Sequence, residues 1–269
     1  MPARIAHLRE RLRSLDASPA HAQRVLRLWA QALAQDSGRR PVASFLPRTL
    51  CAELPRLEAQ FASLARLISR HPATDGSERL LVELGDGQSV ESVLLPRGGL
   101  CVSTQVGCAV GCVFCMTGRQ GLLRQVGSAE MVAQVALARH LRPVTKVVFM
   151  GMGEPAHNLD NVAEAIELLG TAGAIGHKNL VFSTVGDLRV FERLPHLAVR
   201  PALALSLHTT KPVLRASLLP NAPRLAPEEL VAHGDAYARA TGYPIQFQWT
   251  LIEGVNDGDD EVEGIAALL

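Results

Sequence analysis

The chain has 269 residues, 48% of them hydrophobic and 20% charged, which is enough to bury a sizeable core in one large domain, or in one domain plus a small one. The first sixteen residues are charged throughout and argue against a secretory signal, and no apolar run approaches the roughly 20 residues of a membrane span. Five cysteines, three of them clustered, favour reduced cytosolic thiols or metal ligands over a disulfide framework. We therefore expect a cytoplasmic protein with no membrane association.

The charge is distributed unevenly along the chain. The formal net charge is only +1, yet residues 1–71 contain twelve arginines, no lysine and five acidic residues. A basic first quarter joined to an acidic remainder favours contact with a polyanion such as RNA. A solvated, arginine-rich helical surface would explain the same composition, so charge alone leaves both interpretations open.

Residues 1–75 are predicted to form a small helical domain. Ser18 and Pro19 mark the start of its second helix, as an N-cap followed by proline in the first turn. Apolar residues recur at helical spacing in each of three segments. They are Ile5, Leu8, Leu12 and Leu15 in the first, Val25, Leu28, Trp29 and Ala32 in the second, and Leu57, Phe61, Leu64 and Ile68 in the third.

Residues 76–97 are predicted to form a β-hairpin extension, because two alternating apolar segments flank the turn sequence GDGQS. In residues 98–269, strand and helix patterns alternate about five times. The short apolar strand segments are typical of a buried parallel sheet. They are LCVST, KVVFMGM, NLVFSTV, ALALSLH and IQFQWTLI.

This alternation predicts an α/β fold, a parallel (β/α) barrel or partial barrel whose chemistry gathers at the carboxyl ends of the strands. The last residues, EVEGIAALL, stop about two turns into a helical pattern and before a final strand. We therefore expect the barrel to be truncated at its C-terminal end, unless the fold closes atypically.

Three thiols lie in one tight loop, GCAVGCVFC, at Cys108, Cys112 and Cys115. Thiolates in a short loop suit an iron–sulfur cluster or zinc, and three ligands on a cubane leave one iron open for a substrate. Cys-x3-Cys-x2-Cys directly after a first strand resembles the radical S-adenosylmethionine (SAM) superfamily. The alternative is a structural zinc site that recruits Cys101, although this residue lacks the paired spacing that zinc sites prefer.

Polar and glycine residues follow the later strands. MGMGEP offers Gly151 and Gly153, which permit close backbone approach, and the Glu154 carboxylate. The next two strands end in FSTVG and LSLH, and we expect these ends to meet at one rim. An ordinary tight turn and satisfied structural side chains are the alternative.

Six segments occur in an order that resembles the RlmN/Cfr family of radical SAM RNA methyltransferases, which methylate an adenine carbon. The resemblance covers most of residues 88–258, and residues 1–75 resemble that family's accessory RNA-binding domain more loosely. The segments are VESVLLP, LCVSTQVGCAVGCVFCMTG, VVFMGMGEPAHNLDNV, FSTVG, ALSLHTT and EGVNDG.

The resemblance implies a role for individual residues. Glu91 would accept the adenine ring proton, and Cys101 would help resolve a covalent RNA–enzyme intermediate. The [4Fe–4S] cluster would be bound by Cys108, Cys112 and Cys115. SAM would be contacted by Gly153, Glu154, Ser183, Ser206, Leu207 and His208.

The resemblance also implies partners. We expect a monomer that acts on large-subunit rRNA ahead of tRNA, at adenine C2 ahead of C8, with a reducing donor such as flavodoxin or ferredoxin. The family mechanism needs a methyl-carrying cysteine near the C-terminus, but no cysteine follows Cys115, so that cysteine is expected beyond the present chain.

Two rival functions stay open at this stage. One is a radical SAM enzyme with a different substrate, and the other is a non-catalytic RNA-binding protein with a structural metal. Cys51 matches no family role and is expected to be a buried small residue.

Overall fold

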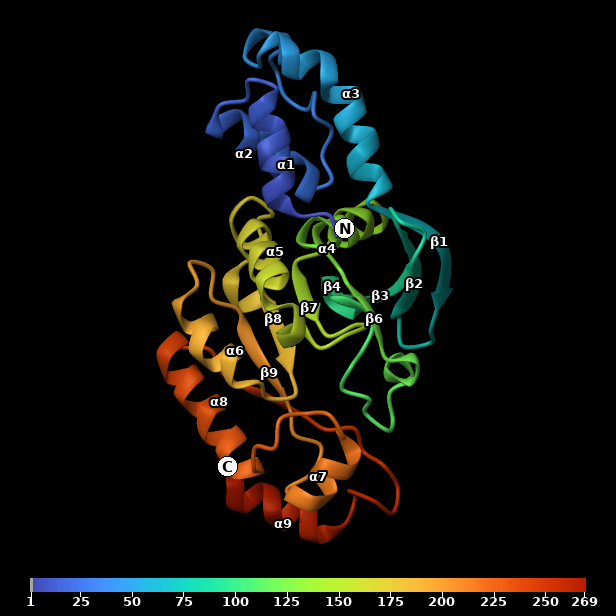
Figure 1. Cartoon of the computed structure of the whole chain (residues 1–269), viewed down its shortest axis with the longest axis vertical. Coiled ribbons are helices and arrows are strands. Elements are labelled where there is room, and N and C mark those ends of the chain that lie inside the picture. The colour runs from blue at the N-terminus through green and yellow to red at the C-terminus, as the bar shows by residue number, and fades with distance from the viewer. Residues whose placement is uncertain (1) are drawn as a thin grey trace.

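The computed structural model describes residues 2–269 and is built around one eight-stranded sheet (Figure 1). The first three strands are antiparallel, β3 pairs antiparallel with β4, and the strands from β4 onward run parallel. The predicted partial α/β barrel, preceded by a hairpin, is confirmed. In spatial order the strands are β1 (Ala65–Pro72), β2 (Glu78–Leu84), β3 (Ser89–Leu95), β4 (Gly99–Val102), β7 (Lys146–Phe149), β8 (Leu180–Thr184), β9 (Ala202–Ser206) and β10 (Gln246–Gln248).

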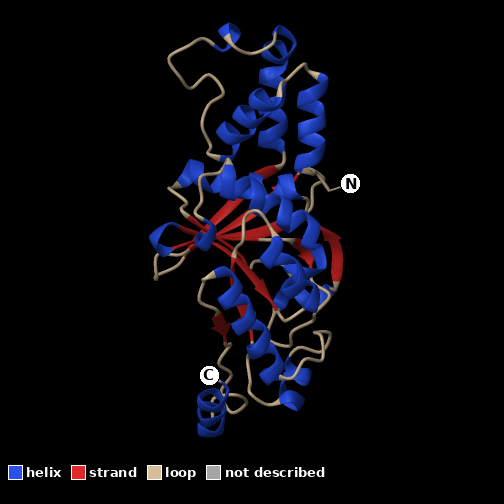
Figure 2. Ribbon diagram, turned by 90° about the vertical axis from the view of Figure 1, so that its left-hand side faces the viewer, coloured by secondary structure: helices blue, strands red, loops and turns tan. Residues whose placement is uncertain are grey.

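Helices connect the parallel strands, as parallel pairing requires (Figure 2). A separate two-stranded sheet, β5 (Gln105–Gly107) with β6 (Leu122–Gln125), braces the loop between its strands. The crossover helices are α4 (Ser128–Leu141), α5 (Leu159–Thr171), α6 (Leu188–Arg193), α7 (Pro212–Leu218) and α8 (Pro227–Thr241), and α9 (Asp259–Leu268) follows β10.

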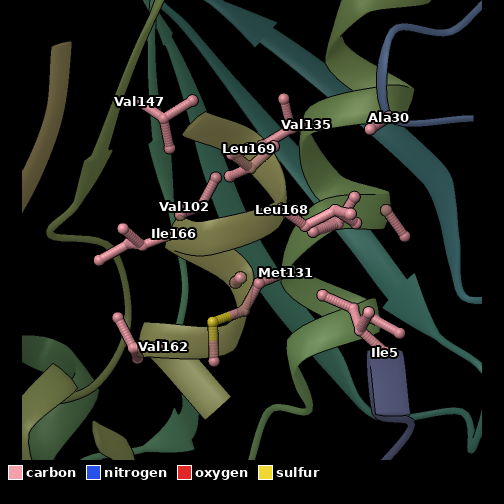
Figure 3. Close-up of a cluster of buried hydrophobic side chains, with 14 of the residues drawn as sticks. Ile5, Ala30, Val102, Met131, Val135, Val147, Val162, Ile166, Leu168 and Leu169 are labelled. Carbon is pink, nitrogen blue, oxygen red and sulfur yellow. The ribbon is translucent and has the colours of Figure 1, made fainter. Parts of the chain in front are cut away.

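The helix-covered face of the sheet holds the main core. Val102 and Val147 lie on this face, and Figure 3 shows them against side chains of α4 and α5, such as Met131 and Ile166. The α4 helix is buried on nearly all sides, which is why its sequence, SAEMVAQVALARHL, shows little amphipathic contrast.

The opposite face of the sheet is lined by smaller side chains. Cys101, Val148, Val181, Ala202 and Ala204 form a compact cluster there. The first four are register partners on β4, β7, β8 and β9, so period-two alternation puts them on one face. Because these side chains are small, they fill little of the space on the inner face of the sheet.

The N-terminal helices α1 (Ile5–Ser14), α2 (Pro19–Ala30) and α3 (Arg48–Ser63) form a layer at one end of the molecule (Figure 1). Ser18 caps α2 as predicted, by accepting a hydrogen bond from the His21 N–H at 3.3 Å. Trp29 on α2 stacks on Phe61 of α3, with ring centroids 4.7 Å apart.

Two sequence expectations in this region are wrong. Ala32 was expected on the second helix, but α2 ends at Ala30 and Ala32 follows it with φ +56°. Ile68 was predicted on the third helix, but α3 ends at Ser63 and Ile68 lies on β1. The segment satisfies its backbone by antiparallel pairing with β2, and strand pairing overrides the helical spacing of its apolar residues. Within residues 2–269, no helix has both the length and the apolar character needed to cross a bilayer.

The helical layer is joined to the core by backbone contacts at the start of α4. The Ile5 N–H donates to Ser128 Oγ at 2.9 Å, and the Ala129 N–H donates to the Ala3 carbonyl at 3.0 Å. A Cβ on Gly127 would lie 2.0 Å from the Ala3 carbonyl oxygen. Only glycine allows this approach, although its backbone φ of −72° suits any residue.

We predict that Gly127→Ala lowers the free energy of unfolding by about 1–3 kcal/mol, because the added methyl pushes the Ala3 backbone away from α4. Urea denaturation measures the effect. Gly176→Ala is the matched control, since Gly176 has φ −59° and a Cβ there has room, 3.8 Å from Asn179 Nδ2. Equal stabilities of the two variants would contradict this account of the junction.

Candidate functional site

The cysteine loop, residues 108–115, leaves β5 and is followed by a 3-10 helix, Met116–Gln120. Cys108 is buried, and Cys112 and Cys115 are half-buried. Burial, and secondarily the charges of Glu154 and Cys115, raises the pKa of Cys108. Burial, and secondarily the charges of Cys108 and Cys115, raises the pKa of Cys112 to about 12. Ionisation of Cys108 and Cys112 is therefore unfavourable in the protein without a bound metal.

These thiols do not form a ready site for a single metal ion. Within residues 2–269, no group of three or more His, Cys, Asp or Glu side chains is arranged to hold one. Cys101, the fourth thiol of the zinc alternative, belongs to a different apolar cluster, on the inner face of the sheet. A cubane spaces its ligand sulfurs more widely than one ion does, since each sulfur bonds a different iron.

The α7 helix and the segment that follows it hold the cysteine loop in place. The Val113 N–H donates to the Leu218 carbonyl at 3.0 Å, and Asn221 Nδ2 donates to the Ala109 carbonyl at 2.9 Å. Leu218 also packs in one apolar cluster with Cys108 and Val185. The loop is thereby fixed against the carboxyl end of β8.

The glycine-rich turn after β7 packs tightly on the end of β4. The Gly151 N–H donates to the Val102 carbonyl at 3.0 Å, and the Met152 N–H donates to Ser103 Oγ at 2.8 Å. Gly153 has φ +102°, and a Cβ there would lie 2.5 Å from the Gln105 side chain. Both the backbone conformation and the lack of space require glycine at this point.

The turn delivers Glu154 into a buried position, 4% exposed. Its Oε1 accepts the Ala156 N–H and its Oε2 accepts the Val185 N–H, each at 3.1 Å. Burial raises the pKa of the carboxyl group to about 7, despite these hydrogen bonds. A cationic ligand placed beside it would favour the ionised form, so the carboxyl group suits an ammonium partner.

His208 at the end of β9 is held as a neutral donor. Its backbone has φ +63°, and its Nδ1 accepts the Thr250 N–H at 3.0 Å. Burial, and secondarily the charge of Arg215, lowers its pKa to about 4. The proton of the neutral ring therefore lies on Nε2. The ring meets Phe114 of the cysteine loop edge-on, at 4.9 Å between centroids.

Ser183 and Ser206 lie on the inner face, at the carboxyl ends of β8 and β9. Gln248 on β10 is the register partner of Ser206 and lies on the same face. Its Nε2 donates to Met150 Sδ at 3.2 Å, and its Oε1 accepts from Ser183 Oγ at 3.5 Å. The strand ends therefore meet at one rim.

Glu91 and Cys101 share that inner face but differ in environment. The Glu91 N–H donates to Met152 Sδ at 3.3 Å, while its half-exposed carboxylate pairs with Arg79 Nη1 at 2.6 Å. Cys101 is buried, and burial raises the pKa of its thiol to about 12. The predicted contact residue Leu207 packs its side chain into the helix-covered core, so only its backbone can face a ligand.

Sequence reasoning assigned no role to Gln248, Arg215 or Asn256. Asn256 is 1% exposed, and its Nδ2 donates to the His208 carbonyl at 2.7 Å and to the Thr250 carbonyl at 2.8 Å. It lies in EGVNDG, one of the segments that resemble the RlmN/Cfr family, but the sequence alone does not reveal that it anchors His208. For Arg215 the signal was an arginine within the apolar helix PVLRASL.

Comparisons with known proteins agree with this arrangement. The radical SAM superfamily model matches residues 102–269. A probable RNA methyltransferase of Methylibium petroleiphilum is 75% identical over 268 residues, covering 99% of this chain and 75% of the relative. One from an Azoarcus species is 71% identical over 266 residues, covering 99% and 77%.

A solved structure of a radical SAM methyltransferase from Sphaerobacter thermophilus superimposes with a TM-score of 0.80 at 34% identity. The superposition covers 99% of this chain and 80% of the other chain.

We predict that Glu154 makes the metal-free protein less stable as pH rises. Its pKa in the folded protein, about 7, lies above the ordinary value of 4.5. The contribution of Glu154 to the free energy of unfolding is therefore complete below pH 4.5 and is lost as the pH rises through 7. Between pH 5 and pH 8, the free energy of unfolding of Glu154→Gln should rise relative to that of wild type by at most about 3 kcal/mol. Urea denaturation at both pH values measures this difference.

Glu228→Gln, on the exposed surface of α8, is the control and should leave the pH dependence unchanged. A Glu154→Gln variant that follows the wild-type profile would show that this carboxyl group is not held protonated.

Proposed function

The chain belongs to the radical SAM superfamily, and we propose that it is an RNA methyltransferase of the RlmN/Cfr type that methylates an adenine carbon. Large-subunit rRNA is the proposed substrate ahead of tRNA, and C2 the proposed position ahead of C8. Relatives at 75% and 71% identity carry the name probable RNA methyltransferase, which supports this reading. The observation that carries it is the contact of the cysteine loop with the polar strand ends, through Phe114 and His208.

The superfamily implies a [4Fe–4S] cluster and SAM, and the residues present fit both. Cys108, Cys112 and Cys115 are free thiols in one loop and would hold the cluster. When bound, cluster and SAM together supply a carbon-centred radical that can react with an unreactive ring carbon. The thiols must lose their protons when they bind iron. Cluster binding must therefore offset the free-energy cost of deprotonating buried thiols.

SAM binding is assigned to the turn after β7 and to the next two strand ends. Glu154 offers a carboxylate to the amino group, and neutral His208 offers an Nε2–H donor to an acceptor oxygen. Ser183 and Ser206 add hydroxyl groups at the same rim, while Gly153 and the Leu207 backbone complete the contact set. An uncharged imidazole donates without adding positive charge beside a sulfonium ligand.

Glu91 is the proposed acceptor of the adenine proton. Its strand is tied to the turn by the Ser103 Oγ donor, 2.5 Å from the Glu91 carbonyl. Its carboxylate is half-exposed and lies on the inner face, so an incoming base can reach it. Arg79 pairs with this carboxylate in the structure, and we propose that the pair separates when the substrate binds.

Cys101 is proposed to act late, as the thiol that releases the product. Its raised pKa keeps it protonated and unreactive in the resting protein. The methyl-cysteine route needs one further cysteine near the C-terminus, and the last cysteine of these 269 residues is Cys115.

The remaining assignments concern the environment of the enzyme. The arginine-rich residues 1–75 would contact the RNA backbone, whose phosphates supply most of the affinity. The target base must leave its stack to reach the rim. We further assign a reducing donor such as flavodoxin or ferredoxin, a monomeric state and a cytoplasmic location.

Anaerobic reconstitution of the full-length gene product, followed by incubation with SAM, a reductant and unmodified rRNA, tests the proposal. We expect a brown protein with about four iron atoms per chain, cleavage of SAM, and methyladenosine in the RNA by mass spectrometry. A colourless, zinc-loaded protein would favour the non-catalytic alternative. A brown protein that cleaves SAM but leaves RNA unmodified would favour a different substrate.

We predict that Cys112→Ala abolishes both the chromophore and SAM cleavage, because the cluster loses one of three ligands. Iron analysis and detection of the cleaved nucleoside measure the two effects. Cys51→Ala is the control, since this thiol lies on α3 and donates only to the Leu46 carbonyl. Retention of either property by the Cys112 variant would remove the ligand assignment.

A further inference from the structure

Arg215 is a buried cation without a counter-ion. It is 3% exposed, and no other arginine or lysine in residues 2–269 is buried. None of the ion pairs among these residues includes it. A charge removed from water without an opposite charge is strongly unfavourable, so a protein retains one only where something else compensates it.

The hydrogen bonds of Arg215 do not provide that compensation. Its Nη2 donates to the Val185 carbonyl at 2.6 Å and to the Ser206 carbonyl at 3.0 Å. Both acceptors are neutral, and Nε is buried without a partner. The guanidinium group is thus anchored behind the ends of β8 and β9, with its charge unneutralised.

The cysteine loop lies directly against the helix that carries this cation. Leu214 and Leu218, the neighbours of Arg215 on α7, pack in the apolar cluster that contains Cys108 and Cys112. The charge of Arg215 also reaches the site, since it lowers the pKa of His208. Three thiolates outweigh the positive charge of an oxidised cubane, and reduction adds one more negative charge.

We propose that Arg215 is the counter-charge of the cluster, a positioning residue whose buried cation stabilises the anionic thiolate–iron assembly and raises its reduction potential. The inference rests on the cluster of the proposed function. It explains why an unpaired cation is retained beside three thiols whose negative charge appears only on metal binding. Net charge and nearby dipoles are established determinants of iron–sulfur potentials.

A purely structural role is the alternative. In that case Arg215 would only tie the ends of β8 and β9 together, and any long hydrogen-bond donor would serve. Charge and hydrogen bonding can be separated by substitution. Arg215→Lys keeps the cation, Arg215→Gln keeps a donor without charge, and Arg215→Met removes both.

The test is a redox titration of the reconstituted protein, followed by electron paramagnetic resonance without RNA. At the wild-type midpoint, we expect at least a tenfold lower ratio of reduced to oxidised cluster in the Gln and Met variants. For a one-electron couple this corresponds to about 59 mV. The Lys variant should stay within about threefold of wild type on the same scale.

Arg224→Gln is the matched control. Arg224 is exposed, follows Asn221, which hydrogen-bonds to the cysteine loop, by three residues, and also donates to two backbone carbonyls, those of Ala216 and Pro220. Its loss should leave the potential unchanged, because solvent screens its charge. Thermal unfolding gives a second readout, in which cluster loading should raise the Tm of wild type more than that of Arg215→Gln.

Failure of the proposed function and failure of the counter-charge proposal give different experimental results. A wild-type protein that binds no cluster defeats the proposed function. A fully loaded Gln variant with the wild-type potential defeats only the counter-charge. If the neutral variants do not fold, the Lys variant decides: a potential that falls when alkaline pH removes the charge of the lysine supports the inference, and a potential independent of pH overturns it.

Discussion

The close packing of the turn after β7 on the end of β4 is the constraint on which the rest of the site depends. Gly151 and Met152 hydrogen-bond to Val102 and Ser103, and the Glu154 N–H donates to Gln105 Oε1 at 2.8 Å. The same contact reaches the hairpin through Glu91 and the cysteine loop through β5. A side chain at Gly151 or Gly153 would separate these three parts of the site at once.

The polar groups at the rim are unusual in their charge states. Glu154 has a pKa near neutrality, His208 is neutral, and Arg215 carries a charge without an opposite partner. In isolation each costs stability, since burial is unfavourable for polar and charged groups. Together they suit the charged ligands proposed for this site, an anionic thiolate cluster and a cationic sulfonium with an ammonium group.

Buried hydrogen bonds beyond β9 keep the rim rigid. Asn256 fixes the His208 carbonyl and accepts the Ile252 N–H at 2.7 Å, while Glu261 at the start of α9 accepts from Thr209 and Thr210. Neither residue reaches the rim itself. Their role is to hold a positive-φ backbone at His208, which an isolated loop would not maintain.

Local patterning determined much of this protein, and the tertiary structure decided the rest. The cysteine spacing, the glycine turn and the apolar strands are encoded in short segments, so the sequence alone predicts the partial barrel and places the three thiols in one loop. Ile68 lies on a strand and not on the third helix, because antiparallel pairing of β1 with the next strand, β2, overrides the helical spacing. Arg215, Gln248 and Asn256 have no local signature, because their roles come from partners 9 to 98 residues away along the chain or from the loss of solvent. Burial and unpaired charge arise only when the chain is folded, and they decide which polar groups serve the site.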